Sequence, residues 1–324
     1  MVVPSIPLPR YDGLRMELPV YLRLMKMWWL QRPDIVHVAT EGPLGWSAIS
    51  AAERLGLPIS SSFHTNFHHY GRYYGLGPIK GLAVAYLRHF HNRTHCTMVP
   101  TDEMAEMFRR GEYRNVTVLA RGVDTDLFKP DRRREDIRLS WGLKQDDLAI
   151  VYVGRLAKEK NVDLAVNAFE AMHEIEPRCH FVLVGDGPKN IPLKKRFPDF
   201  HYCGLRLGED LAAHYSSGDV FLFPSITETF GNVVTEAMAN GLLVLTYDYA
   251  SGRQFVRSWE NGVLARFDDS QDYIAKAREI MERRSEWKSL RTEARMTALG
   301  ITWEAVVGHF EQLLFDVLAR TKFV

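Results

Sequence analysis

The chain has 324 residues, of which 46% are hydrophobic, and its 41 basic and 40 acidic side chains leave a formal net charge of +1. This length suits two hydrophobic cores better than one, and the nearly balanced charge argues against a broad nucleic-acid-binding surface. The three cysteines are widely spaced and no apolar run approaches the roughly 18 to 20 residues that span a bilayer. We therefore expect a cytoplasmic protein that is soluble or peripheral at a membrane.

The first part of the chain alternates apolar runs typical of strands with helical patterns. Strands are expected at residues 35–38, 57–63, 96–99 and 116–119, and helices at 44–55, 79–92 and 102–110. Before them, residues 22–32 mix basic side chains with Trp28 and Trp29, which suits either a membrane interface or a helix packed onto a part of the domain that this chain lacks, and we favour packing. An arginine-rich stretch at 129–136 then interrupts the alternation and predicts the domain linker.

The alternation resumes in the second part, with strands near residues 150, 181, 200, 220, 242 and 263 and a last amphipathic helix over 302–318. This pattern predicts an α/β protein with two doubly wound, parallel, Rossmann-like sheets. We divide the chain into a first domain at 1–130, a second at 131–300 and a terminal segment at 301–324.

Three strand ends in the second domain carry polar or glycine-rich turns. The strand near 150 ends in Gly154 and Arg155, with Lys160 a few residues later and Asn161 placed to cap a helix that begins near Val162. The strand near 181 ends in a turn with Gly185 and Gly187. Because ligands bind at the carboxyl ends of strands in open α/β sheets, two cations there suit a diphosphate.

The third of these strands, near residue 220, leads into a segment with two carboxylates, Glu228 and Glu236, which are eight positions apart. The segment between them contains a helix start at Gly231, and we expect Glu228 in a loop and Glu236 about two turns into the helix. Carboxylates accept hydrogen bonds from sugar hydroxyls, and the unpaired N–H groups of a helix start suit phosphate. This arrangement predicts a nucleotide-sugar site; the alternative is a solvated helix face with two acids.

These motifs, in this order, resemble the donor domain of glycosyltransferase family 4, whose members are retaining enzymes with the two-domain GT-B fold. The segments that start at Glu41, Phe63 and Arg121 also resemble its amino-terminal half, in a branch similar to bacterial GDP-mannose-dependent α-mannosyltransferases. The resemblance implies transfer of a hexose, with mannose the leading candidate, from GDP-mannose or a UDP-sugar to a lipid or glycan acceptor. It also implies that residues 301–324 cross back onto the first, acceptor-side domain.

The resemblance further implies a role for individual residues. Glu228 would hold the sugar hydroxyls, Glu236 would bind the ribose, and Arg155, Lys160 and Gly231 would stabilise the leaving phosphate without a metal or other cofactor. His64 would face the donor sugar, and Arg121 and Asp124 would lie on the acceptor side, with Asp124 holding a turn. The whole expected donor set is Gly154, Arg155, Lys160, Gly185, Gly187, Arg206, Glu228, Phe230, Gly231, Asn232, Val233 and Glu236.

The chain departs from the family pattern at its start. Family members begin with a strand and a glycine-rich loop, whereas the residues before position 35 contain neither, so we expect a first domain that lacks its first strand-helix units. An alternative function is therefore a nucleotide-sugar-binding protein impaired in catalysis. A nicotinamide oxidoreductase is less favoured, because the glycine turn at 185–187 lacks the third glycine of a dinucleotide fingerprint. The histidines near residues 64–69 lack the acid or cysteine that would complete a metal site, so no metal is expected.

Overall fold

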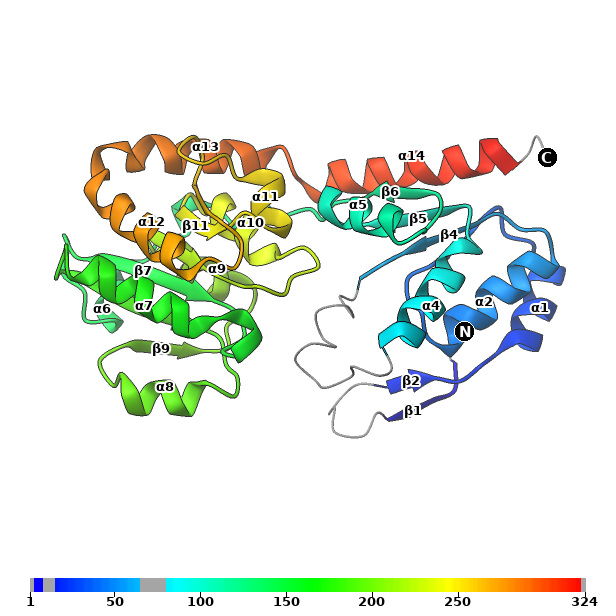
Figure 1. The fold of residues 1–324 in the computed structure, drawn as a ribbon, viewed down its shortest axis with the longest axis horizontal. Coiled ribbons are helices and arrows are strands. Elements are labelled where there is room, and N and C mark those ends of the chain that lie inside the picture. The colour runs from blue at the N-terminus through cyan, green and yellow to red at the C-terminus, as the bar shows by residue number, and fades with distance from the viewer. Residues whose placement is uncertain (1–2, 8–14, 65–79, 322–324) are drawn as a thin grey trace. The chain divides into compact units, whose positions relative to one another are not determined.

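The computed structural model describes residues 3–7, 15–64 and 80–321 (Figure 1). The chain divides into two compact units, one made of Met1–Ala120 with Val306–Val324 and the other of Arg121–Ala305. The boundary between these units lies between residues 120 and 121, before the linker predicted at residues 129–136. That stretch lies inside the second unit, where it forms the short helix η2 (Pro130–Arg132) and the start of α6 (Glu135–Ser140).

In the first unit, the described strands form a parallel sheet in the order β3, β4, β5, β6. Their bounds are Val36–Val38, Ile59–Ser62, Cys96–Val99 and Val116–Val118, which confirms the four predicted strands. The helices are α1 (Tyr21–Leu30), α2 (Pro43–Arg54), α4 (Lys80–Asn92) and α5 (Asp102–Arg110). A small antiparallel pair, β1 (Ser5–Pro7) with β2 (Arg15–Glu17), was not predicted.

Helix α5 illustrates how local sequence sets these elements. Thr101 precedes it in extended conformation, and its side-chain oxygen accepts a hydrogen bond from the Met104 amide at 3.2 Å. Acidic residues occupy the first turn and arginines the last, which favours the helix dipole. The helix therefore begins and ends where its sequence predicts.

The second unit contains a parallel sheet in the order β12, β11, β10, β7, β8, β9. The strands are β7 (Leu148–Val153), β8 (Cys179–Val184), β9 (His201–Gly204), β10 (Val220–Phe223), β11 (Leu243–Tyr247) and β12 (Val263–Ala265). Every residue of β7, β10 and β11 is buried, as expected for strands covered by helices on both faces. After β7 the chain adds β8 and β9 on one side of the sheet, and after β10 it adds β11 and β12 on the other side. The direction of winding therefore reverses between β7 and β10.

Helices of the second unit pack in pairs along the sheet. Helix α7 (Val162–His173) packs against α12 (Ser270–Glu282), and α10 (Asn232–Ala239) against α13 (Trp287–Leu299). The connections also contain η3 (Lys158–Lys160), α8 (Asn190–Arg196), α9 (Gly208–Ser216), α11 (Ala250–Phe255) and η4 (Arg284–Glu286). The last helix, α14 (Trp303–Thr321), begins in the second unit and continues into the first, where Val317 packs with Cys96 and Met98.

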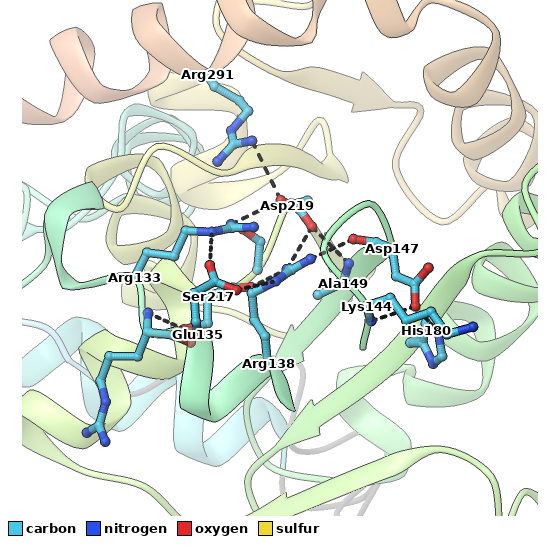
Figure 2. Close-up of polar contacts among 12 residues, drawn as sticks. Arg133, Glu135, Arg138, Lys144, Asp147, Ala149, His180, Ser217, Asp219 and Arg291 are labelled. Carbon is cyan, nitrogen blue, oxygen red and sulfur yellow. Dashed lines mark hydrogen bonds and ion pairs between the residues drawn. The ribbon is translucent and has the colours of Figure 1, made fainter. Parts of the chain in front are cut away.

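A buried ionic network lies at the amino ends of β7 and β10 (Figure 2). The guanidinium of Arg138, which is 2% exposed, donates to Asp219 Oδ2 at 3.1 Å and to the carbonyls of Ser217 and Asp147 at 2.9 and 2.6 Å. Asp219 also accepts from Arg133 at 3.1 Å and from the Ala149 amide at 2.9 Å. Because each buried charge is paired and hydrogen-bonded, the network can tie α6 to two central strands.

Within the described ranges, none of the helices has both the length and the apolar character needed to cross a lipid bilayer.

Candidate functional site

The turns that follow β7 and β8 are locked together by glycines. Gly154 and Gly185 have φ of 150° and 136°, and a Cβ added to Gly185 would overlap the Gly154 carbonyl oxygen. A Cβ on Gly187 would lie 2.6 Å from the Leu156 carbonyl oxygen. The Leu156 amide donates to the Asp186 carbonyl at 3.0 Å, and the Lys189 amide donates to the Leu156 carbonyl at 2.8 Å. These backbone hydrogen bonds also hold the two turns together. Only glycine allows this close approach of the two backbones.

The turns after β7 and β10 meet where the winding of the sheet reverses. The first contains Arg155 and Lys160, and the second contains Ser225 and Glu228. In this class of sheet, the region outside the carboxyl ends of the two strands at such a reversal is the usual ligand position, and we refer to it below as the crevice. The fold therefore brings together the motifs that the sequence separates.

Lys160 and Glu228 form the closest polar contact at this crevice. Lys160 Nζ donates to Glu228 Oε1 at 2.5 Å, and Ser225 Oγ donates to the same oxygen at 2.7 Å. The Tyr249 hydroxyl donates to the Glu228 carbonyl at 2.9 Å, which fixes the backbone of the loop. The two side chains are 22% and 14% exposed, so a ligand can reach them while water screens them only in part.

The second carboxylate, Glu236, lies in α10, but one turn from its start rather than two. The helix begins at Asn232 because Gly231, with φ of 92°, occupies the position before it. The Tyr215 hydroxyl donates to Glu236 Oε2 at 2.9 Å. Burial raises the pKa of Glu236, and the hydrogen bond from Tyr215 lowers it in part. Gly231 has no side chain to cap α10, and the Val234 amide donates to the Gly231 carbonyl at 3.1 Å, so the amides of Asn232 and Val233 are the ones placed to receive an anion.

Other expected donor residues occupy different positions around the crevice. The Arg155 side chain is 56% exposed and its nearest ion-pair oxygen, on Glu159, is 3.6 Å away. Arg206 donates to the Cys203 carbonyl at 2.9 Å and to Asp210 at 3.0 Å, so the loop that carries it is held to α9. Phe230 is fully buried against Phe255, and only its backbone can contact a ligand.

Asn161 does not cap α7 as predicted. The helix begins at Val162 as expected, but Asn161 adopts a left-handed conformation with φ of 53° and its side chain makes no cap hydrogen bond. The tight turn after η3 explains the difference, because asparagine tolerates this conformation better than most residues.

Arg121 and Asp124 belong to the second unit, and they have different surroundings. Asp124 Oδ1 accepts from the amides of Asp126 and Leu127 at 3.1 and 2.8 Å, which confirms its predicted role of holding a turn. Burial lowers the pKa of Arg121, and the Glu228 carboxylate opposes that shift. Arg121 is therefore within electrostatic reach of Glu228.

His64 belongs to the first unit, where it follows β4 and is exposed. Histidines 68 and 69 lie outside the described residues. Among the residues that the structure describes, no group of three or more histidine, cysteine or acidic side chains is arranged to hold a metal ion.

Sequence reasoning missed several residues that support the site. Tyr215, Tyr249 and Ser251 come from elements remote from the glycine turns, and Ser251 Oγ donates to the Gly231 carbonyl at 2.9 Å. No local motif signals them. For Ser225 the sequence does provide a signal, because this residue directly follows Pro224 at the end of β10 and lies three positions before Glu228.

Comparisons with known proteins agree with this geometry. Residues 133–297 match the family model for glycosyl transferases group 1, and residues 2–127 match that for glycosyltransferase family 4. The chain is 33% identical over 318 residues to a GDP-mannose-dependent alpha-mannosyltransferase of Mycolicibacterium smegmatis, covering 96% of this chain and 82% of the relative. It is 26% identical to alpha-monoglucosyldiacylglycerol synthase of Acholeplasma laidlawii, covering 98% and 83%.

Solved structures share the fold. HepE of Anabaena in complex with UDP superposes with a TM-score of 0.76 at 17% identity, over 91% of this chain and 82% of that one. Sucrose-phosphate synthase of Thermosynechococcus elongatus gives 0.74 at 20% identity, over 91% and 76%. With its two parallel-sheet units and its match to both family models, the chain belongs to the GT-B glycosyltransferases of family 4, and it is a hexosyltransferase.

Proposed function

We propose that the protein transfers mannose from GDP-mannose to a hydroxyl group of a lipid or glycan acceptor, with retention of anomeric configuration. The observation that carries this proposal is the contact of Lys160 and Ser225 with Glu228 beside the start of α10. It provides a carboxylate for sugar hydroxyls next to a cation and free helix amides for phosphate. The named function of the mycobacterial relative supports mannose and guanine as the donor groups.

The proposed reaction breaks the bond between the anomeric carbon and the phosphate oxygen and forms a bond from that carbon to the acceptor oxygen on the same face. The bonding pair leaves with GDP, and the acceptor proton passes to the departing phosphate oxygen. Charge therefore develops on the diphosphate, where Arg155, Lys160 and the first amides of α10 act as fixed stabilisers. Loss of one such donor costs about 3 to 4 kcal/mol in the barrier, by comparison with oxyanion holes.

The contact between Lys160 and Glu228 fits this sequence of events. At 2.5 Å, it compensates both partly buried charges. When the donor binds, its hydroxyls and phosphate offer each side chain a partner of its own. The proposed reaction uses no metal and no other cofactor, because cations and backbone amides neutralise the leaving group. Glu236 is proposed to accept hydrogen bonds from the ribose hydroxyls.

Donor binding tests the proposal directly. Saturating GDP should raise the unfolding temperature of the wild type, since a ligand at 100 times its Kd adds about 2.7 kcal/mol of stability. The double variant Arg155→Ala with Lys160→Ala should lose this protection. A matched double variant of exposed cations away from the crevice, Arg178→Ala with Lys195→Ala, should keep it.

The second half of the test measures transfer. The wild type should release GDP from GDP-mannose faster in the presence of a hydroxyl acceptor, and the product should be the α-anomer by NMR. UDP protecting as well as GDP would contradict the guanine assignment. An absence of protection by both nucleotides would contradict the proposed donor site itself.

We also propose that helix α1 contacts an anionic membrane surface at the cytoplasmic face. Leu22, Trp29 and Leu30 are 80%, 76% and 68% exposed, and the helix carries Arg23 and Lys26 but no acidic residue. Trp28 instead packs against the core of the first unit, so only Trp29 remains available to lipid. Apolar side chains with flanking cations are typical of interfacial helices.

Flotation with vesicles checks the membrane proposal. The wild type should bind vesicles rich in phosphatidylglycerol and release them at high salt. Leu22→Ser with Trp29→Ser should reduce binding, whereas Leu205→Ser with Leu207→Ser, which alters two leucines exposed at 70% and 71% elsewhere, should not. Equal loss in both variants would contradict a role for α1.

A further inference from the structure

A buried carboxylate and a buried imidazole face each other in the first unit. Glu41 Oε1 and His91 Nε2 are 3.5 Å apart, and their side chains are 11% and 0% exposed. Neither atom has a hydrogen-bond partner among the residues that the structure describes. Buried polar atoms without partners are uncommon, so this pair requires an explanation.

The orientation of His91 is set from its other side. His91 Nδ1 lies 2.9 Å from Ser61 Oγ, which is itself close to the hydroxyls of Thr94 and Thr97 at 3.1 and 3.4 Å. The Thr94 hydroxyl donates to the His91 carbonyl at 2.8 Å. If Ser61 donates to Nδ1, the ring proton is on Nε2 and points at the Glu41 carboxylate. The hydroxyl cluster therefore fixes the ring so that it holds Glu41.

This arrangement is not a nucleophilic triad, even though it joins a carboxylate, a histidine and a serine. Ser61 and His91 are both fully buried. A reacting substrate cannot approach the Ser61 hydroxyl. Of the three side chains, only that of Glu41 reaches the surface.

The backbone that carries Glu41 is held in place at the carboxyl end of β3. A Cβ added to Gly45 would overlap the Thr40 carbonyl oxygen, so the start of α2 packs directly on the end of this loop. The Tyr86 hydroxyl donates to the Glu41 carbonyl at 2.5 Å. Next to Glu41, however, a Cβ added to Gly42 meets no described atom within 4 Å. Glu41 is thus rigidly supported next to a position that no described atom fills, on the edge of the sheet where α/β proteins bind ligands.

We propose that Glu41, positioned by His91, accepts a hydrogen bond from a neutral hydroxyl of the acceptor, so that the group recognised here is a polyol or sugar rather than a phosphate. This inference rests on the proposed glycosyl transfer and deepens it. With Oε1 turned toward His91, the part of the Glu41 carboxylate that remains exposed can accept a charge-assisted hydrogen bond from a hydroxyl donor. An anionic headgroup would place like charges together in a poorly screened position.

Acceptor kinetics of the full chain test the inference. GDP-mannose is held at saturation, and transfer is measured to diacylglycerol, to methyl α-mannoside and to phosphatidylglycerol, an anionic lipid with free hydroxyls, in detergent micelles. With whichever neutral acceptor the wild type uses, Glu41→Gln should raise the acceptor KM about tenfold or more, as expected for a hydrogen bond to a charged group. The thermal protection by GDP should stay unchanged, because Glu41 is not part of the donor site.

Two further variants separate this role from simple structural support. Glu106→Gln removes an exposed carboxylate from α5 in the same unit and should leave the KM unchanged. His91→Gln should raise the acceptor KM less than Glu41→Gln, because it alters orientation and keeps the charge. If Glu41→Gln does not fold, Glu41→Asp keeps the charge and withdraws it by one methylene, and the same rise in KM is expected.

The outcomes distinguish this inference from the proposed function. A wild type that transfers to none of the acceptors counts against the proposed function. A wild type that transfers to a neutral acceptor with the same KM in Glu41→Gln, or in Glu41→Asp where that variant is used, overturns the role of Glu41. A wild type that uses phosphatidylglycerol alone overturns the assignment of an uncharged acceptor.

Discussion

Glu236, for which we propose ribose binding, lowers the stability of the folded protein when it is ionised. Its carboxylate lies in α10 and has the Tyr215 hydroxyl as its hydrogen-bond donor. Burial raises its pKa, since a charged group loses hydration when it leaves water. The ionised form that would accept hydrogen bonds from a ribose is therefore the form that the folded chain disfavours.

The first prediction concerns the pH dependence of Glu236→Gln. For an acid with a raised folded-state pKa, the native state binds the proton more tightly, so the charged form destabilises the protein at pH values above that pKa. The amide removes this cost and can still accept from Tyr215. We expect the variant to be more stable than the wild type at pH 7 and to be protected less by GDP.

Thermal unfolding over a pH series checks this prediction. The advantage of Glu236→Gln should shrink as the pH falls and disappear below the ordinary glutamate value of 4.5, where the residue is protonated in both states. Glu209→Gln, at an exposed position, should change stability by less than about 0.5 kcal/mol. A variant that is less stable than the wild type at pH 7 would show that the charged form of Glu236 is favoured by its surroundings.

Among the structural elements, the locked turns after β7 and β8 control the geometry of the crevice. Because Gly185 lies against the Gly154 carbonyl oxygen, these turns hold the loop with Arg155 and Lys160 at a fixed height above the sheet. A side chain at Gly185 would therefore have to push the ends of β7 and β8 apart.

Gly185→Ala is therefore expected to be far more disruptive than Gly204→Ala. Alanine at 185 meets a backbone atom and should cost about 3 kcal/mol or more. Gly204 also has a positive φ, of 69°, but a Cβ there meets no described atom within 4 Å. Its replacement should cost only about 1 to 2 kcal/mol. Urea denaturation measures both costs, and equal values would mean that the turns are not locked by the glycine contact.

The elements also show what local sequence can predict. Strands and helices with clear periodicity, such as β7 and α5, form where expected because burial and capping act within a few residues. The β1–β2 pair was missed, since its strands have three residues each and give no periodic signal. The carboxylates and glycine turns of the site were found because they follow strand ends. Tyr215 and Tyr249 were not, because their contacts depend on which helices the fold places beside β10.

At the scale of the whole molecule, the second unit separates stability from binding across one sheet. The Arg138–Asp219 network lies at the amino ends of β7 and β10 (Figure 2). The proposed donor site with Glu228 lies at their carboxyl ends. Removing one partner of a buried ion pair leaves an uncompensated charge, which is more costly than replacing the pair. Arg138→Met should accordingly destabilise the second unit by about 3 to 5 kcal/mol.

Calorimetry of the full chain with and without GDP tests whether the two ends of the sheet act independently. Since the chain forms two compact units, their unfolding need not be a single transition. Arg138→Met should lower the temperature of the transition that GDP raises, because both act on the second unit. The upward shift caused by GDP should remain, since the crevice keeps its contacts while the unit is folded. Arg178→Met, at a surface ion pair, should have almost no effect. If Arg138→Met instead abolished GDP protection at temperatures where the variant is folded, the network would have to position the donor site through β7 and β10 as well as stabilise the sheet.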